Sequence, residues 1–292
     1  YDYSSNIDIK IGGDLNASSA DTEIAVTGGK DLMLSGSPFG TVRTVDAGGL
    51  GRILKISDSD TELTLSNIKL TGGHAADGKG GAVYVEAGGI LKLTGKTVIT
   101  PSGGADANAP GKNDVYLKNG NTIKLTGPLT AAGTVARITP EIYSESTQVL
   151  GGTSTLLSSE HGKFTVTQPD DGFLWKIKDN GRLQAIPNTV NNSDGKAWKK
   201  LLDAVRDLPD GSTITISGIV QATNDAGNSG EIIIEKNLTI KGKTGAASDI
   251  LDANSSGTNH PATTHRIFKV ENGKTLTLEN LTLTGGKAIN SD

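Results

Sequence analysis

An internal repeat constrains this chain more than any other feature of its sequence. Residues 61–73 return as residues 274–286, with Leu-Thr-Leu near the start of both segments and Leu-Thr-Gly-Gly at the end. Upstream, residues 31–36 and 52–56 match residues 237–242 and 266–270 in the same order. Segments that recur in one order indicate a duplicated structural module. We therefore expect one full module, the opening of a second, and further copies of the same module as partners in the parent chain.

The two copies differ in the spacing of their matching segments. Leu276 lies 213 residues after Leu63, whereas Leu238 lies 206 residues after Leu32. Residues Lys243 to His265 fall between these two sets of matches. We expect this stretch to be an enlarged loop in the second copy.

Each module is built from short runs in which apolar and polar residues alternate. A period of two is typical of β-strands, and Gly, Asn or Asp close most of these runs. Short, closely spaced strands without helical periodicity favour a solenoid whose coils stack at the ~4.8 Å strand spacing. Because parallel crossovers are nearly always right-handed, we predict an all-β, right-handed parallel β-helix. The alternating pairs include Ile9/Ile11, Ile24/Val26, Leu32/Leu34, Leu63/Leu65, Val83/Val85, Leu91/Leu93, Val115/Leu117 and Ile123/Leu125.

One segment has a clear helical pattern. In residues 196–208, Trp198, Leu201, Leu202, Val205 and Leu208 form a single apolar stripe. The preceding Ser193 or Asp194 could cap the first amides. The helix directly precedes the first strands of the second copy, where an amphipathic helix would cover the open end of a solenoid. We expect a capping α-helix there; a partner-binding helix is the alternative.

These elements predict three parts of the chain. Residues 1–130 would be the β-helix of the first module. Residues 131–187 would close it with longer strands, because Asp179-Asn-Gly181 is a strong hairpin signal and Trp175 is expected to pack in that hairpin. Residues 188–292 would hold the capping helix and the first coils of a second, incomplete β-helix module.

Two asparagines occupy equivalent bends in the two copies. Asn67 and Asn280 each separate two strand-like runs within the longest repeated segment. Asparagine tolerates left-handed backbone, and its side chain can bond to neighbouring coils. We expect a structural role for both residues.

Composition excludes several classes of protein. Aromatic residues are 4% of the chain and glycines number 39, so the core must be assembled from small aliphatic layers. The chain has no cysteine, which excludes disulfides, thiolate metal sites and a cysteine nucleophile. With 28 basic and 32 acidic residues, it lacks the basic footprint of a nucleic-acid-binding protein. No apolar run approaches the ~20 residues of a membrane span, so no membrane insertion is expected.

One glycine-rich stretch is the best candidate for a ligand contact. Residues 73–80 have the spacing of a phosphate-binding loop, but Gly80 stands where a Ser or Thr must hold magnesium, and strands follow instead of a helix. We therefore expect a wide solenoid loop on which His74, Asp77 and Lys79 could contact a ligand. No metal site and no cofactor are predicted.

The carboxylates of a polysaccharide-active enzyme are not gathered on one predicted coil. A lyase needs clustered acids for calcium, and a hydrolase needs acids that flank the glycosidic bond. Asp170 and Asp171 form the only Asp-Asp pair, and they follow the predicted solenoid strands. Arg266 is placed like part of a substrate clamp, but Arg52 precedes the same alternation in the first copy, so it could simply flank a strand. No catalytic residue is predicted.

The repeated motifs carry a resemblance. The run from Leu63 to Gly73, followed by Gly80-Gly-Ala-Val-Tyr-Val85, resembles coils of pectin-lyase-like right-handed β-helix modules in large repetitive bacterial surface proteins. The Gly-Gly-Ala-Val run is similar to the Gly-Gly-Ala-Ile repeat of polymorphic outer membrane proteins. The Phe-x-x-Asn partner repeat of those proteins is absent here. The resemblance implies an extracellular or cell-surface location and an adhesin or passenger-domain role.

The functional expectation is therefore a non-enzymatic adhesin or structural β-solenoid whose loops face a host or matrix protein or glycan. A polysaccharide lyase or glycoside hydrolase of the parallel β-helix type is the first alternative. A carbohydrate-binding module is the second, and it would require Trp175, Tyr84 or Tyr116 to be exposed on a groove.

Overall fold

The computed structural model describes residues 7–19, 23–169, 171–256 and 259–287. The chain divides into two compact units, which are treated separately below. The first contains residues 1–168 and 175–185, and the second contains residues 169–174 and 186–292. Within the described residues, no helix is both long enough and apolar enough to cross a membrane.

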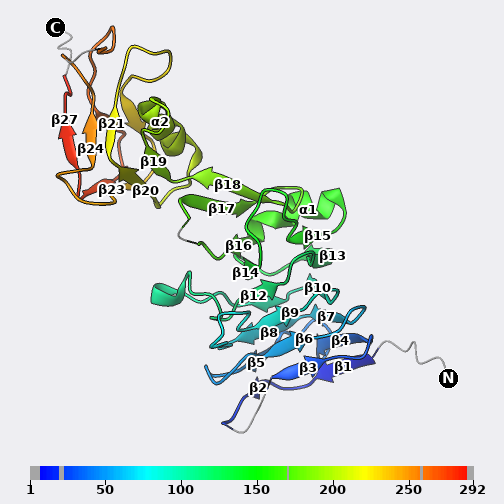
Figure 1. Ribbon diagram of the computed structural model, residues 1–292. Helices are drawn as coiled ribbons and strands as arrows, with labels where there is room; N and C mark the ends of the chain where they lie inside the picture. The colour runs from blue at the N-terminus through cyan, green and yellow to red at the C-terminus, as the bar shows by residue number, and fades with distance from the viewer. Residues whose placement is uncertain (1–6, 20–22, 170, 257–258, 288–292) are drawn as a thin grey trace. The chain divides into compact units, whose positions relative to one another are not determined.

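The first unit is a parallel β-solenoid with three sheets. Along the chain, successive strands enter the three sheets in turn, except in the last two coils, whose strands enter only two of the sheets. Each strand pairs in parallel with its counterpart in the neighbouring coil (Figure 1). Sheet 1 contains β1 (Ile7–Ile11), β4 (Asp31–Gly36), β7 (Glu62–Ser66), β10 (Ile90–Gly95), β13 (Ile123–Leu129) and β15 (Leu150–Gly151). Sheet 2 contains β2 (Leu15–Asn16), β5 (Arg43–Asp46), β8 (Ile68–Thr71) and β11 (Val98–Ile99). Sheet 3 contains β3 (Ile24–Val26), β6 (Leu54–Ile56), β9 (Val83–Val85), β12 (Val115–Leu117), β14 (Ala136–Pro140) and β16 (Phe164–Val166). This architecture confirms the predicted parallel β-helix.

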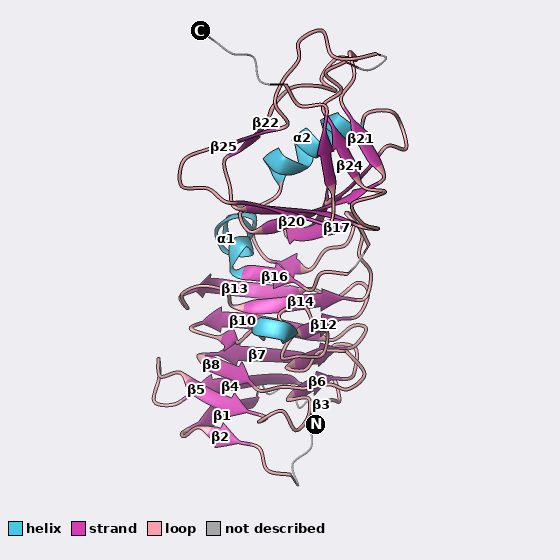
Figure 2. Ribbon diagram, turned by 90° about the vertical axis from the view of Figure 1, so that its left-hand side faces the viewer, coloured by secondary structure: helices cyan, strands magenta, loops and turns pink. Residues whose placement is uncertain are grey.

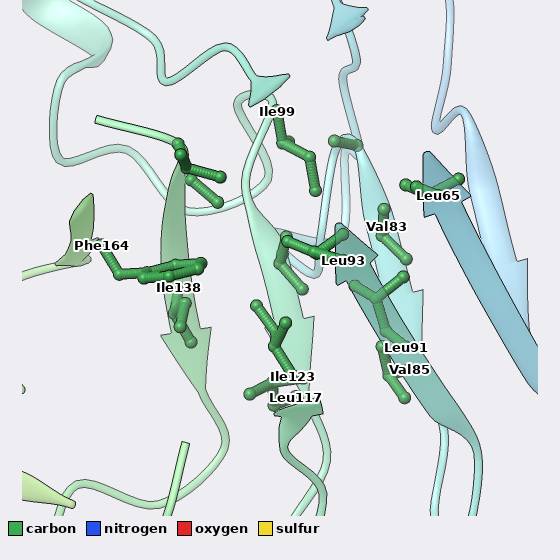
Figure 3. Close-up of a cluster of buried hydrophobic side chains, with 14 of the residues drawn as sticks. Leu65, Val83, Val85, Leu91, Leu93, Ile99, Leu117, Ile123, Ile138 and Phe164 are labelled. Atoms are coloured by element: carbon green, nitrogen blue, oxygen red, sulfur yellow. The ribbon is translucent and has the colours of Figure 1, made fainter. Parts of the chain in front are cut away.

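Aliphatic side chains of successive coils stack inside the solenoid. The register places Leu63 beside Leu91, and Leu91 beside Ile123, and all three are fully buried. Val83, Val115 and Ile138 form a matching row on sheet 3. Figure 3 labels Val83 and Ile138 of this row, together with Leu91 and Ile123 of sheet 1. Burial of each such side chain contributes about 1.5–3 kcal/mol. The core is therefore the layered aliphatic stack that the low aromatic content predicts.

The solenoid of the first unit extends beyond the boundary expected at residue 130. Strands β14, β15 and β16 still belong to sheets 1 and 3. In the last coil, the chain runs from β15 through α1 (Ser154–Glu160) and the short 3-10 turn η2 (His161–Lys163) into β16; α1 and β16 are labelled in Figure 2. Another 3-10 turn, η1 (Gly104–Asp106), lies in the loop after β11. Residues 131–166 therefore continue the coils and do not yet close them.

A hairpin follows the last coil, as the sequence predicts. It is formed by β17 (Phe173–Ile177) and β18 (Leu183–Pro187). At its turn, the Lys178 amide donates to the Arg182 carbonyl oxygen at 2.8 Å. Trp175 is 6% exposed and packs edge-on to Tyr143. The prediction that Trp175 is buried in this hairpin is confirmed.

The second unit repeats the arrangement of the first. One sheet contains β19 (Thr189–Asn191), β20 (Ser212–Ser217), β23 (Leu238–Gly242) and β26 (Leu276–Glu279). A second contains β21 (Ile219–Gln221), β24 (Ile250–Asp252) and β27 (Thr282–Thr284), and a third contains β22 (Ile232–Ile234) and β25 (Phe268–Val270). All of these pairs are parallel.

The predicted helix is α2 (Ala197–Asp207), and it covers the first coil of the second unit. Trp198, Leu201 and Val205 join the apolar core of this unit, and the Trp198 indole Nε1 donates to the Gly230 carbonyl oxygen at 2.9 Å. The N-cap residue is Lys196, which has no side-chain cap. Of the two expected capping residues, Asp194 accepts a hydrogen bond from the Lys196 amide at 3.1 Å, one residue before the helix begins. Asn228 from the following coil accepts a hydrogen bond from the Lys199 amide, which satisfies one free amide of the first turn.

The expected enlarged loop from Lys243 to His265 is only partly correct. It contains β24, which pairs with β21 and β27 and is the counterpart of β5 in the first copy. The extra residues of the second copy lie between Asp252 and Arg266, whose counterparts are Asp46 and Arg52. The insertion therefore follows β24 and leaves the coil itself intact.

The two equivalent asparagines have the backbone conformation that the sequence predicts. Asn67 has φ 55° and Asn280 has φ 52°. The Asn67 Oδ1 atom accepts a hydrogen bond from the Lys96 amide of the next coil at 3.0 Å. Both residues therefore occupy left-handed bends between strands, where Asn is tolerated.

Candidate functional site: two joined loops on adjacent coils

Two long loops leave adjacent coils of the first unit and join each other. We call residues 72–81 and 101–112 together the loop platform. The Ala75 amide donates to the Gly111 carbonyl oxygen at 2.8 Å, and His74 and Lys112 form an isolated antiparallel bridge. The Gly78 Cα lies so close to Gly111 that a Cβ at residue 111, where φ is +78°, would meet it at 2.9 Å. The loops therefore form one surface.

Two polar residues at the start of β12 hold the platform from inside. The Asn113 Oδ1 accepts from the Gly73 amide at 2.8 Å, and its Nδ2 donates to the Leu70 and Thr100 carbonyl oxygens. The Asp114 Oδ1 accepts from the Gly81 amide at 2.8 Å. Asn113 is 4% exposed and Asp114 is fully buried. Buried polar groups of this kind are costly unless they are bonded, so they fix the loop to the coil.

Arg137 holds the second loop. Its guanidinium donates to four carbonyl oxygens of that loop, those of Asp106, Ala107, Ala109 and Lys112. The side chain is 2% exposed, and this burial lowers the pKa of Arg137 from its ordinary value. Arg137 also helps to line a cavity of about 360 Å³ beside the loop, together with Ser102, Asn108 and Thr165. A buried cation thus organises a loop that contributes no strand to the solenoid.

Arg52 holds the first loop from the preceding coil. Its guanidinium pairs with Glu23 at 2.7 Å and with both carboxylate oxygens of Asp77, and it also donates to the Lys79 carbonyl oxygen. The second copy repeats part of this arrangement, because Arg266 pairs with Glu231. Arg52 and Arg266 are therefore positioned as links between coils, and a substrate-clamp role has no support in these contacts.

The three predicted ligand-contact residues lie on one loop but have different surroundings. Asp77 is paired with Arg52, although its side chain remains 56% exposed. Lys79 is exposed, and its Nζ lies 5.8 Å from the centre of the Tyr116 ring. His74 is half-buried and contributes its backbone to the bridge with Lys112. Asp77 and Lys79 are thus the two charged groups that this loop presents at its surface.

The tyrosines of sheet 3 form a covered stack. Tyr84 and Tyr116 have parallel rings 5.1 Å apart, and they are 8% and 7% exposed. Burial, with a further contribution from Glu141, raises the pKa of Tyr116 to about 12. Neither ring is exposed in the way that a carbohydrate-binding groove would require, and Trp175 is buried as well.

The described part of the chain shows no cluster of acidic side chains suited to holding a metal ion. Glu160, a further acidic residue at the end of α1, is buried and pairs with Lys163 at 2.9 Å. Asp170 lies outside the described residues, so the pair with Asp171 cannot be placed.

Sequence reasoning missed Asn113, Asp114 and Arg137. Arg137 stands in the apolar run Val135-Ala-Arg-Ile138, and a charge in the middle of a strand-like run is a signal that something must pair with it.

Comparison with family models, curated proteins and solved structures found no match.

Proposed function

We propose that this chain is part of a non-enzymatic adhesin or structural β-solenoid, located at a bacterial surface or secreted, that presents the loop platform to a host or matrix protein or glycan. The observation that carries the proposal is the way the platform is held. Asn113, Asp114 and Arg137 are buried polar residues whose bonds fix the two loops.

Fixed loops favour binding, because a surface that is already ordered loses little conformational entropy when a ligand binds. Loops held by a rigid scaffold commonly carry the binding residues of a protein. The stacked parallel strands of the solenoid supply such a scaffold, because each coil contacts its neighbouring coils along the whole length of the unit.

The exposed groups of the platform favour a polar ligand. The first loop presents Asp77 and Lys79, and the second presents Asp106 and Asn108. The small residues Ala76 and Ala105 directly precede Asp77 and Asp106 and are exposed, so a ligand could approach the backbone closely. A surface with both charge signs and few apolar groups suits hydrogen-bonded contact with a glycan or a hydrophilic protein segment.

The first test is affinity electrophoresis of the chain through gels cast with acidic and neutral polysaccharides, with and without calcium. In parallel, immobilised matrix proteins would be screened for binding. For any ligand found, Lys79→Glu should weaken binding at least about tenfold, because it reverses a charge on the platform. Lys124→Glu is the matched control, since Lys124 is an exposed lysine on sheet 1.

The outcomes separate the functional classes. Retardation without shortening of the polymer, or binding to a matrix protein, supports the proposal when Lys79→Glu weakens it and Lys124→Glu does not. A shortened polymer would refute the non-enzymatic role and favour the lyase or hydrolase. Equal effects of the two variants would show that the ligand binds elsewhere on the chain.

A further inference from the structure

The first coil of the first unit leaves apolar side chains exposed. Ile9 on β1, Leu15 on β2 and Ile24 on β3 are each 48% exposed. β1 is the terminal strand of sheet 1, and β4 is its neighbour in that sheet (Figure 1). Within the described residues, no strand pairs with the other edge of β1, so this end of the solenoid combines an unpaired strand edge with an apolar surface. We call the coil of β1, β2 and β3 the open coil. Such edges are usually covered or blocked in natural proteins.

The duplicated unit shows what the open coil looks like when it is covered. The strand registers make Ile214 the counterpart of Ile9, since Ile9 pairs with Leu34 and Ile214 pairs with the matching Ile240. By the same comparison, Val220 corresponds to Leu15 and Ile232 to Ile24. Ile214, Val220 and Ile232 are all 0% exposed. Three equivalent positions thus change from half exposed in one copy to fully buried in the other.

The covering element in the second unit is the strand-plus-helix segment from β19 to α2. β19 pairs in parallel with β20 and extends the sheet by one strand. From α2, Trp198, Leu201 and Val205 pack into the same core cluster as Ile214, Val220 and Ile232. A strand therefore satisfies the edge of the sheet, while a helix covers the ends of the other two strands.

A lysine beside the open coil supplies a second, independent match. In the second unit, the Lys236 Nζ donates to the Arg206 and Leu208 carbonyl oxygens at the C-terminal end of α2. Its counterpart in the first unit is Lys30. Lys30 directly precedes β4, and Lys236 is separated from β23 by Asn237 alone. A cation at this place complements the free carbonyls and negative dipole of a helix C-terminus. Lys30 is exposed.

From these matches we propose that the open coil binds a strand-plus-amphipathic-helix segment of the β19–α2 type. The strand adds to β1, the apolar stripe of the helix covers Ile9, Leu15 and Ile24, and Lys30 binds the last carbonyls of the helix. Recognition is of the same kind as strand addition combined with a helix in an apolar groove. The inference is independent of any ligand bound by the loop platform.

The test measures, by calorimetry, the binding of a synthetic peptide with the sequence of residues 188–209 to the whole chain. The chain's own copy of this segment is tethered, and its high effective concentration keeps it in place. We expect saturable binding with one peptide per chain. Ile9→Asp should weaken binding at least about tenfold, because the peptide would bury an unpaired carboxylate.

Matched controls make the result specific. Leu283→Asp places the same change at a 40% exposed leucine on the last coil of the second unit, and it should leave binding unchanged. A peptide in which the residue corresponding to Trp198 is alanine should bind at least about tenfold more weakly, because the largest apolar group of the stripe is lost.

Three results would overturn the proposal. These are no saturable binding of the peptide, equal binding by the Ile9→Asp chain, or equal weakening by Leu283→Asp. If sedimentation instead shows self-association of the unmodified chain that Ile9→Asp abolishes, and the peptide does not bind, then the occupant of the open coil is a second copy of the chain.

Discussion

Replacing Asn113 by alanine tests how firmly the loop platform is tied to the solenoid. The substitution removes three hydrogen bonds, to the Gly73 amide and to the Leu70 and Thr100 carbonyl oxygens. At about 0.5–1.5 kcal/mol for each bond, the loss is about 1.5–4.5 kcal/mol. Asn113 also has φ 48°, so a Cβ without a compensating side-chain bond adds about 1 kcal/mol of backbone strain.

A glycine variant separates these two contributions. Asn113→Gly loses the same three bonds but accepts the left-handed conformation without strain. We therefore expect Asn113→Gly to be more stable than Asn113→Ala by about 1 kcal/mol. Asn119→Ala serves as the control, because Asn119 is exposed and its substitution should change the free energy of unfolding by less than about 0.5 kcal/mol.

The assay can follow the two units independently. The chain has two tryptophans, with Trp175 in the core of the first unit and Trp198 in the core of the second. Incorporation of 5-fluorotryptophan gives one ¹⁹F resonance for each unit during denaturant unfolding. Asn113→Ala should shift the Trp175 transition and leave the Trp198 transition in place. A change of less than about 0.5 kcal/mol, or equal stability of the alanine and glycine variants, would refute the reasoning.

Three further predictions follow from buried or perturbed groups. Arg137→Ala leaves four loop carbonyl oxygens without their donor, so it should destabilise the first unit by about 3 kcal/mol or more. It should also expose residues 101–112 to limited proteolysis. A loop that resists proteolysis as well as in the unmodified chain would contradict this prediction. Burial of Asp249 favours the neutral acid, but hydrogen bonds from the amides of Gly218, Thr244 and Gly245 outweigh burial and lower the pKa of Asp249. The stability that the Asp249 carboxylate gives to the second unit should therefore be present above about pH 4 and be lost as pH falls through the lowered pKa. Asp249→Asn should destabilise the second unit by about 2 kcal/mol, measured by the Trp198 signal. Burial raises the pKa of Tyr116 to about 12, so one of the five tyrosines should ionise near pH 12 in an ultraviolet titration, and stability should fall between about pH 10 and 12. Tyr116→Phe should remove the step near pH 12. Loss of absorbance change near pH 10 in this variant would contradict the burial argument.

The fold could be predicted because it depends on local, repeated patterns. Alternation such as Leu63/Leu65 gives strands, and the order of matching segments gives the duplication. The apolar stripe of α2 spans several turns, so its periodicity is unambiguous. By contrast, α1 is a single short helix with buried Leu157 and Glu160, and two turns carry too little periodicity to be recognised.

The platform could not be predicted because its contacts depend on coil register. Asn113 reaches Gly73 across 40 residues, and Arg52 reaches Asp77 across 25, and neither pairing follows from sequence spacing alone. Asp77 was expected to contact a ligand, and its additional ion pair with Arg52, which leaves its side chain 56% exposed, could not be predicted from the sequence. One signal was present in both copies: a glutamate directly precedes β3 and β22, and an arginine lies two residues before β6 and β25.

Hydrogen exchange tests most directly whether the loop platform is a fixed surface. The amides of Gly73, Ala75 and Gly81 donate to Asn113, Gly111 and Asp114, so they should be protected to nearly the same extent as strand amides of β9 and β12. Exposed loop amides outside the platform, such as those of Gly120 and Gly133, serve as the fast reference. Protection of the three platform amides is the predicted result. Exchange of these amides as fast as the reference would show that the loops open freely, and it would contradict the view that the solenoid holds them ready for a ligand.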